Sequence, residues 1–190
     1  MQPPAPTRQH ESIAISGKII VRSHPAGTID KWKKLMHEGK TEEAKALLLR
    51  GKTEVEQKNL IVDSSSHGKD ILVQYLISAY NGSNPFPLGI AWGEIGTGNT
   101  APAAGDIALT TPTNRAPVSY ACDFQLQTAQ LQFFFPDGVL ANAMYYEFGT
   151  FIGGSSSIGS GNMFNHALFS TPYSKSAGTD STIELDATFS

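Results

Sequence analysis

The stretch 95–106 most invites a chemical interpretation, because its glycines and threonines suggest a phosphate-binding loop. A Walker-type loop requires Lys and Ser or Thr after its last glycine, whereas here Asp106 follows. A dinucleotide-binding loop requires a glycine that opens a helix, and Pro102 stands close to that point. The stretch therefore predicts a rigid turn rather than a nucleotide site: Gly96 and Gly98 allow positive φ angles, and Pro102 fixes the exit.

Two further places could hold a nucleophile. The Gly/Ser-rich stretch 153–161 has no serine within a Gly-x-Ser-x-Gly frame, so we expect a flexible or interface loop there. Cys122 is the only cysteine, which excludes an intramolecular disulfide and a cysteine-rich zinc site. Its alternating sequence context favours a small buried thiol over a reactive one.

The titratable residues form no recognisable catalytic or metal pattern. None of the five histidines is paired with another histidine or a carboxylate at metal-ligand spacing. We interpret His166 as a satisfied structural residue; in an enzyme, the least favoured alternative, its removal would abolish turnover. The acids of the predicted strands and turns nominate no acid–base pair; they are Asp123, Glu147, Asp180, Glu184 and Asp186. We therefore predict a non-enzymatic protein with no catalytic, cofactor-binding or metal-binding residue.

Composition indicates a single strand-rich domain. The 190 residues include 18 glycines and 11 prolines, and only 16% are charged, which argues against a helix bundle. Residues 1–62 carry 11 basic and 7 acidic side chains, a net charge of +4, whereas 63–190 carry 3 and 10, a net charge of −7. The acidic part argues against nucleic-acid binding. No apolar run is long enough to span a membrane, and the first residues do not form a secretion signal, so we expect assembly in the cytoplasm.

Hydrophobic periodicity places the elements. Strand-like alternation is found at 12–22, at 53–62 and from 88 to the end, whereas 28–51 has helical spacing with a glycine break at Gly39. The most apolar helical stripe, at 68–80, is expected to pack across the sheet. The fold class is therefore mainly β: an antiparallel β-sandwich with one packed α-helix and an αα-hairpin insertion. We assign 12–190 to a single β-rich domain, with the helical insertion at about 28–51, and 1–11 to an extended N-terminal arm.

Candidate contact residues lie in the arm, the helical insertion and the aromatic strands. The arm is either disordered or ordered by a neighbouring subunit. Phe133, Phe134 and Phe135 cannot all face one core, so the outward side chain is either in a second buried layer or an exposed contact, and Tyr145 beside Tyr146 poses the same alternative. The candidate subunit interface consists of Pro3, Pro4, Pro6, Trp32, Met36, Phe134 and Tyr145.

Two stretches together resemble a known class of proteins. One is 58–62, Lys-Asn-Leu-Ile-Val, followed by an apolar helix; the other is Ile-Gly-Thr-Gly-Asn-Thr-Ala-Pro-Ala-Ala-Gly-Asp-Ile-Ala-Leu at 95–109, followed by Arg115. With a loosely fitting last strand at 182–189, they resemble a domain found in tail-fibre, collar and minor virion proteins of tailed bacteriophages. The resemblance covers roughly 55–189 and implies virion assembly without catalytic residues.

The sequence thus predicts an oligomeric, non-enzymatic virion protein of the neck or collar, tail or fibre-attachment region. Its expected partners are copies of itself and other virion proteins, with neither nucleic acid nor membrane, and its expected location is the virion, assembled in the host cytoplasm. One alternative is a capsid decoration protein. Another is a β-sandwich carbohydrate-binding module that would use Trp92, Tyr145 or Tyr173 to bind a glycan.

Overall fold

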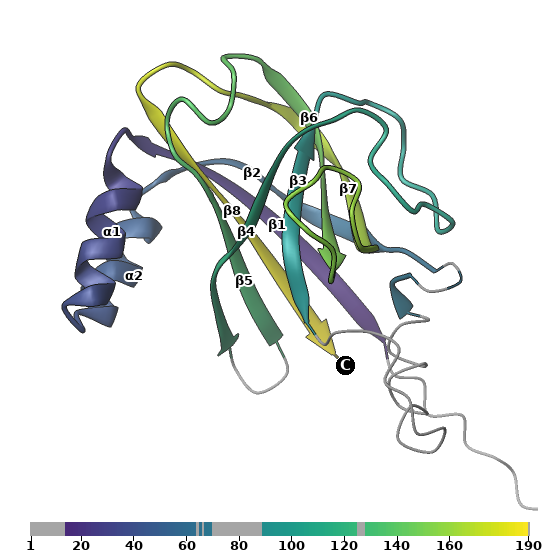
Figure 1. Ribbon diagram of the computed structural model, residues 1–190, viewed down its shortest axis with the longest axis horizontal. Helices are drawn as coiled ribbons and strands as arrows, with labels where there is room; N and C mark the ends of the chain where they lie inside the picture. The colour runs from purple at the N-terminus through teal and green to yellow at the C-terminus, as the bar shows by residue number, and fades with distance from the viewer. Residues whose placement is uncertain (1–13, 64, 66, 70–88, 125–127, 190) are drawn as a thin grey trace, which may run out of the picture.

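Eight strands and two short helices make up the computed structural model, which describes residues 14–63, 65, 67–69, 89–124 and 128–189 (Figure 1). The strands are β1 (Ile15–Pro25), β2 (Lys52–Ile61), β3 (Ile90–Gly96), β4 (Pro112–Phe124), β5 (Thr128–Phe135), β6 (Met144–Ile152), β7 (Asn162–Ser174) and β8 (Thr179–Phe189). The helices α1 (Thr28–His37) and α2 (Thr41–Leu49) lie between β1 and β2, where 28–51 predicted them. The arm at 1–11 and residues 70–80 of the helix predicted at 68–80 lie outside the described residues.

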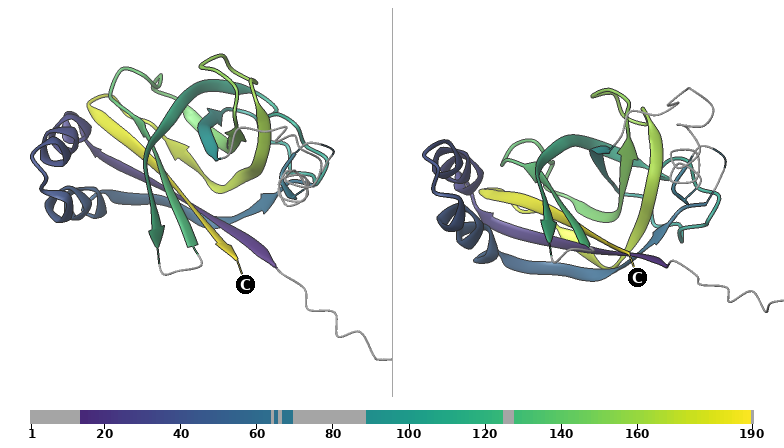
Figure 2. Two further views of the ribbon diagram at one scale, coloured as in Figure 1. Left: turned by 60° about the horizontal axis from the view of Figure 1, so that its bottom comes forward. Right: turned by 90° about the horizontal axis from the view of Figure 1, so that it is seen from below.

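The strands form a closed antiparallel barrel in the order β1-β2-β7-β6-β3-β4-β5-β8, visible as a ring in Figure 2. The mainly β prediction is confirmed, but the β-sandwich is wrong. Two strands close the barrel by joining its two sheets. β2 pairs with β1 in one sheet and with β7 in the other, and β4 pairs with β5 in the first sheet and with β3 in the second. β4 turns the corner at an irregularity between Val118 and Tyr120, the kind of bulge that bends a strand between two sheets.

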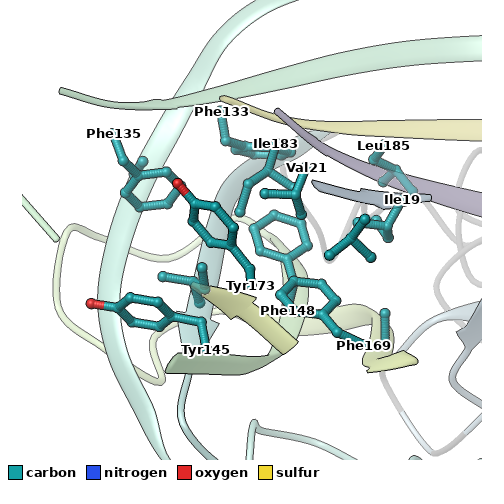
Figure 3. Packing of buried hydrophobic residues seen from close by; sticks show 14 of the residues in the cluster. Ile19, Val21, Phe133, Phe135, Tyr145, Phe148, Phe169, Tyr173, Ile183 and Leu185 are labelled. Atoms are coloured by element: carbon teal, nitrogen blue, oxygen red, sulfur yellow. The ribbon is translucent and has the colours of Figure 1, made fainter. Parts of the chain in front are cut away.

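The barrel interior is filled by alternate side chains of nearly every strand. Phe133 and Phe148 meet edge to face with their ring centroids 5.4 Å apart. Tyr145 and Tyr173, both about 1% exposed, stack at 6.4 Å, and their hydroxyls bond to Ala141 and Ser181. Figure 3 shows these rings with the aliphatic side chains that surround them, among which Ile19, Val21, Ile183 and Leu185 are fully buried.

The helical hairpin packs on the outside of the barrel, over β4 and β5. Trp32 of α1 meets Phe134 of β5 edge to face, with ring centroids 4.7 Å apart. The second small core formed there contains Ile29, Trp32, Ala44, Leu48 and Phe134. The start of α1 is tied to the barrel because Ile29 N donates to Asp180 Oδ2 over 2.8 Å. Phe134 therefore belongs to a second buried layer, while Phe133 and Phe135 face the barrel interior.

A long connection between β3 and β4 covers a different part of the barrel surface (Figure 1). We call residues 97–111 the strap. Leu109 of the strap packs on Phe151 and Met163 in a third apolar cluster. The helical hairpin and the strap thus cover different parts of the outer surface, and each is held by its own small core.

Candidate functional site

A single carboxylate fastens both ends of the strap to the barrel. Glu147 of β6 is fully buried, and its Oε1 accepts from Gly98 N at 3.1 Å and from Thr111 N at 2.7 Å. Its Oε2 accepts from Thr110 N at 3.0 Å. Three backbone N–H groups that would otherwise lack partners in the loop are therefore satisfied by one side chain.

His166 of β7 connects this carboxylate to the middle of the strap. Its Nε2 lies 3.1 Å from Glu147 Oε2, and its Nδ1 lies 2.7 Å from Asp106 Oδ2. Asp106 also accepts from Ala103 N within the strap. Because both acceptors are carboxylates, the imidazole satisfies them together only when both ring nitrogens carry a proton.

The charges of this cluster stabilise one another. Burial opposes the charge of His166, but the hydrogen bonds to Glu147 and Asp106 outweigh it and raise the pKa of the imidazole. Burial also opposes the charge of Glu147, yet the bonds from His166, Thr111 and Thr110 together hold the pKa of that carboxyl below its usual value. The imidazole therefore bridges the barrel and the strap through its two ring nitrogens.

A second buried pair holds the loop 153–161. Arg115 of β4 forms an ion pair with Glu94 of β3, and both side chains are almost completely buried. The guanidinium also donates to Ser160 O and lies over the rings of Trp92 and Phe151, at 5.1 and 4.8 Å from their centroids. Glu94 Oε1 additionally accepts from Gly159 N at 2.6 Å. Arg115, which follows the motif at 95–109, thus links β4 to β3 and to the loop 153–161.

The contacts of the first cluster use each polar side-chain atom of Glu147 and His166. The oxygens of Glu147 accept from strap amides and lie against His166 Nε2, while His166 Nδ1 lies against Asp106 Oδ2. Within the part of the chain that the structure describes, no three His, Cys, Asp or Glu side chains gather as metal ligands would.

A groove lies between the helical hairpin and the barrel. It encloses about 390 Å³, within the range of small-ligand sites. The polar floor is the outer face of β1, β5 and β8, and the wall is apolar, with Trp32 and Met36 from α1 and Leu48 and Leu49 from α2. We call it the hairpin groove. Its floor consists of Lys18, Arg22, Gln130, Gln132, Glu184 and Asp186.

Two similar rows of side chains cross this floor. In one, Gln130 Nε2 donates to Asp186 Oδ1 over 3.2 Å, and Lys18 Nζ lies 3.4 Å from Asp186 Oδ2. In the other, Gln132 Nε2 donates to Glu184 Oε2 over 2.9 Å, and an Arg22 nitrogen lies 3.4 Å from the same oxygen. Each row therefore sets an amide, a carboxylate and a cation side by side across three strands.

The groove continues along β1 beyond the helices. A second hollow of about 460 Å³ shares Lys18 and Asp186 with it and is lined by the hydroxyl groups of Ser16, Thr128 and Thr188. The two hollows are neighbours through these shared residues, and both are lined by hydrogen-bonding groups.

The structure separates the seven candidate interface residues. Phe134 and Tyr145 are buried within the chain itself, and Trp32 is 7% exposed. Met36 is half-buried at the groove wall. Pro3, Pro4 and Pro6 lie outside the described residues. Of the aromatic residues considered for glycan contact, Tyr145 and Tyr173 are inside the barrel and Trp92 lies against Arg115.

The sequence analysis missed the polar rows of the groove floor. Glu184 and Asp186 alternate with the core residues Ile183, Leu185 and Ala187, so they take the outward face of β8. The amide and the cation that complete each row come from β5 and β1, and only the strand register brings them together. An outward Gln-x-Gln on one strand and Glu-x-Asp on another was the available signal, but it does not define a pair without the register.

Comparisons with known proteins give no match: no protein-family model, no curated protein and no solved structure matches the chain significantly. The resemblance to phage virion proteins therefore stays a prediction. Among the described residues, neither helix has the length and apolar character needed to cross a membrane.

Proposed function

We propose that this chain is a non-enzymatic structural subunit of a tailed-bacteriophage particle. It works in the neck or collar, tail or fibre-attachment region, through contacts with copies of itself and with other virion proteins. The observation that supports the proposal is the use of the motif residues. Gly98 and Asp106 of the phage-like segment bind Glu147 and His166, and Arg115 binds Glu94, so the segment serves architecture.

The subunit contacts are expected on the two elements that cover the barrel, the helical hairpin and the strap. The hairpin exposes Leu49 at its end, 67% exposed, and the strap exposes Ile107, 59% exposed. Each is a single apolar side chain on an element that projects from the barrel, which suits a contact made by a neighbour. The half-buried Met36 is the one described member of the original interface set that also reaches the surface.

The test is the number of copies of this chain in purified particles of the phage that encodes it. Quantitative mass spectrometry against the major capsid protein gives this number directly. A value of about 5, 6 or 12, or a small multiple, matches the rings of the neck and tail and supports the proposal. Hundreds of copies favour the alternative of a capsid decoration protein, and absence from the particle overturns the virion role.

A further inference from the structure

We propose that the hairpin groove and its continuation along β1 bind an oligosaccharide. The argument uses the chemistry of the groove alone and does not depend on the virion role. A sugar ring presents hydroxyl groups at its edge and C–H groups on its faces. Its site therefore needs hydrogen-bond donors and acceptors together with an apolar surface. The groove has donors and acceptors on its floor and apolar side chains on its wall.

The floor repeats along the strands. Asp186 and Glu184 are two residues apart on one strand, so the two polar rows are separated by about 7 Å. Each row contains an acceptor carboxylate beside donor groups, which matches hydroxyls because a hydroxyl both donates and accepts. The hydroxyls of Thr128 and Thr188, 2.9 Å apart, extend the series into the second hollow. Successive rows can therefore meet successive sugar units of a chain.

The wall supplies the apolar surface. Met36, Leu48 and Leu49 line the hairpin side, and the ring of Trp32 closes the wall above Phe134. Leu49 is 67% exposed and stands at the end of α2. A sugar ring placed between wall and floor would cover this side chain while its hydroxyls reach the polar rows.

One buried atom of the floor lacks a partner. Gln132 is 8% exposed, and its amide nitrogen is used by Glu184, which can only accept. Its amide oxygen, Oε1, accepts no hydrogen bond. Leaving a buried acceptor unpaired is unfavourable, because it has lost its hydrogen bonds to water without replacing them. A small turn of Gln132 toward a hydroxyl in the groove supplies the missing donor.

The charges of the groove disfavour a nucleic acid. Three cations, Lys18, Arg22 and Lys45, line it together with the carboxylates of Glu184 and Asp186. Lys18 and Arg22 pair with those carboxylates, and Lys45 pairs with Glu42. A polyanionic backbone would meet both acids, whereas a neutral sugar or one with few acidic groups would not.

The experiment is a titration of the full chain with a panel of neutral and uronic-acid-containing oligosaccharides of different lengths, followed by calorimetry and by amide shifts in NMR spectra. We expect saturable binding of at least one oligosaccharide with a Kd below about 1 mM. The shifted amides should be those of β1, β5, β8 and α2. The panel separates neutral from acidic sugars as the source of the same hydroxyl chemistry.

Two pairs of variants locate the site. Lys18→Met removes a floor cation, and its matched control is Lys33→Met, which changes an exposed lysine of α1 that does not line the groove. Leu49→Trp fills the mouth of the groove. Its control is Leu60→Trp, which changes an exposed leucine of β2. Both groove variants should weaken binding by about tenfold or more with an unchanged melting temperature, and both controls should bind as the wild type does.

Binding that is lost only in the groove variants supports the proposal. Two results overturn it: no binding of any oligosaccharide up to about 10 mM, or binding that survives both Lys18→Met and Leu49→Trp. Neither result bears on the copy number in particles, so failure of the glycan site and failure of the virion role are distinguishable.

Discussion

Gly98 of the strap and Glu147 of β6 lie in contact because the glycine has no side chain. The Gly98 amide donates to Glu147 Oε1 over 3.1 Å, and a Cβ at position 98 would stand 2.4 Å from that same oxygen. The Cβ of Thr110 would lie 2.7 Å from the added atom. The second glycine of the Gly-Thr-Gly segment is therefore fixed by space and not by an unusual backbone angle.

Gly98→Ala should destabilise the protein by about 1–3 kcal/mol, since the added methyl group pushes Glu147 away from the strap amides. Gly105→Ala is the matched control, because a Cβ there meets nothing within 4 Å. Chemical denaturation of both variants measures the difference. A Gly98→Ala protein as stable as the Gly105→Ala protein would contradict the clamp.

The His166 cluster predicts a pH dependence of stability. The folded-state pKa of His166 is raised above its unfolded value, so its contribution is fully present below about pH 6.5 and is lost as the pH rises through the folded pKa. His166→Gln should cost about 1–3 kcal/mol at pH 6 and less at pH 9. The measurement is the free energy of unfolding of wild type and variant from pH 5.5 to about 9.

Subtracting the variant from the wild type isolates this group from others that titrate in the same range. His24 is one of these: its pKa is lowered, first by burial and then by Arg22, so its contribution changes with the opposite sign. His37→Gln, on the exposed end of α1, is the control substitution. If the wild-type and His166→Gln curves stay parallel, the imidazole does not carry the bridging charge.

The seam between β2 and β7 depends on the side chain of Gln57. The backbone register there covers only Leu60 with His166 and Ile61 with Asn165. Farther along, the Gln57 amide donates to Leu168 O and accepts from Ser170 N, so a side chain replaces a missing stretch of ladder.

Gln57→Leu should therefore loosen the seam, with a loss of about 1–3 kcal/mol and faster hydrogen exchange of the Ser170 amide. Lys58→Gln, at the neighbouring exposed position, should change neither quantity. Unchanged protection of Ser170 in the Gln57→Leu protein would show that the seam holds without this side chain.

Docking of the helical hairpin depends on Phe134. Phe134→Ala should cost about 3–5 kcal/mol, because it leaves a cavity under Trp32. In a Trp92→Phe background, the remaining tryptophan, Trp32, reports the change as a red-shifted emission. Phe189→Ala, 39% exposed on β8, is the control and should be close to neutral. Unshifted emission in the Phe134→Ala protein would show that the helices dock by other contacts.

Local pattern was enough to predict the strands, the two helices of the insertion and the mainly β class. The alternation of Phe133, Phe134 and Phe135 also posed the right question, but the answer needed the partner: Trp32 covers the outward ring. Which faces are covered is a property of the tertiary structure, and sequence period alone does not contain it.

Closure of the barrel and the polar clusters could not be predicted for a related reason. A strand shared between two sheets reads as one long alternating segment, so nothing in the period of β4 distinguishes a sandwich from a barrel. His166, Glu147 and Asp106 are separated by 19 and 60 positions, and only the strand order brings them together. The same holds for the groove floor, which takes each row from three strands.

Closure also limits how copies of this chain can associate. Each of the eight described strands hydrogen-bonds to a neighbour on both sides. An unpaired strand edge is a ready template for pairing with another chain. The described part of the barrel leaves no such edge along the β1–β8 and β5–β8 seams. Contacts between copies through the described part of the barrel are therefore expected to use side chains of the helices, the strap and the outer strand faces, and not backbone pairing at the β1–β8 and β5–β8 seams.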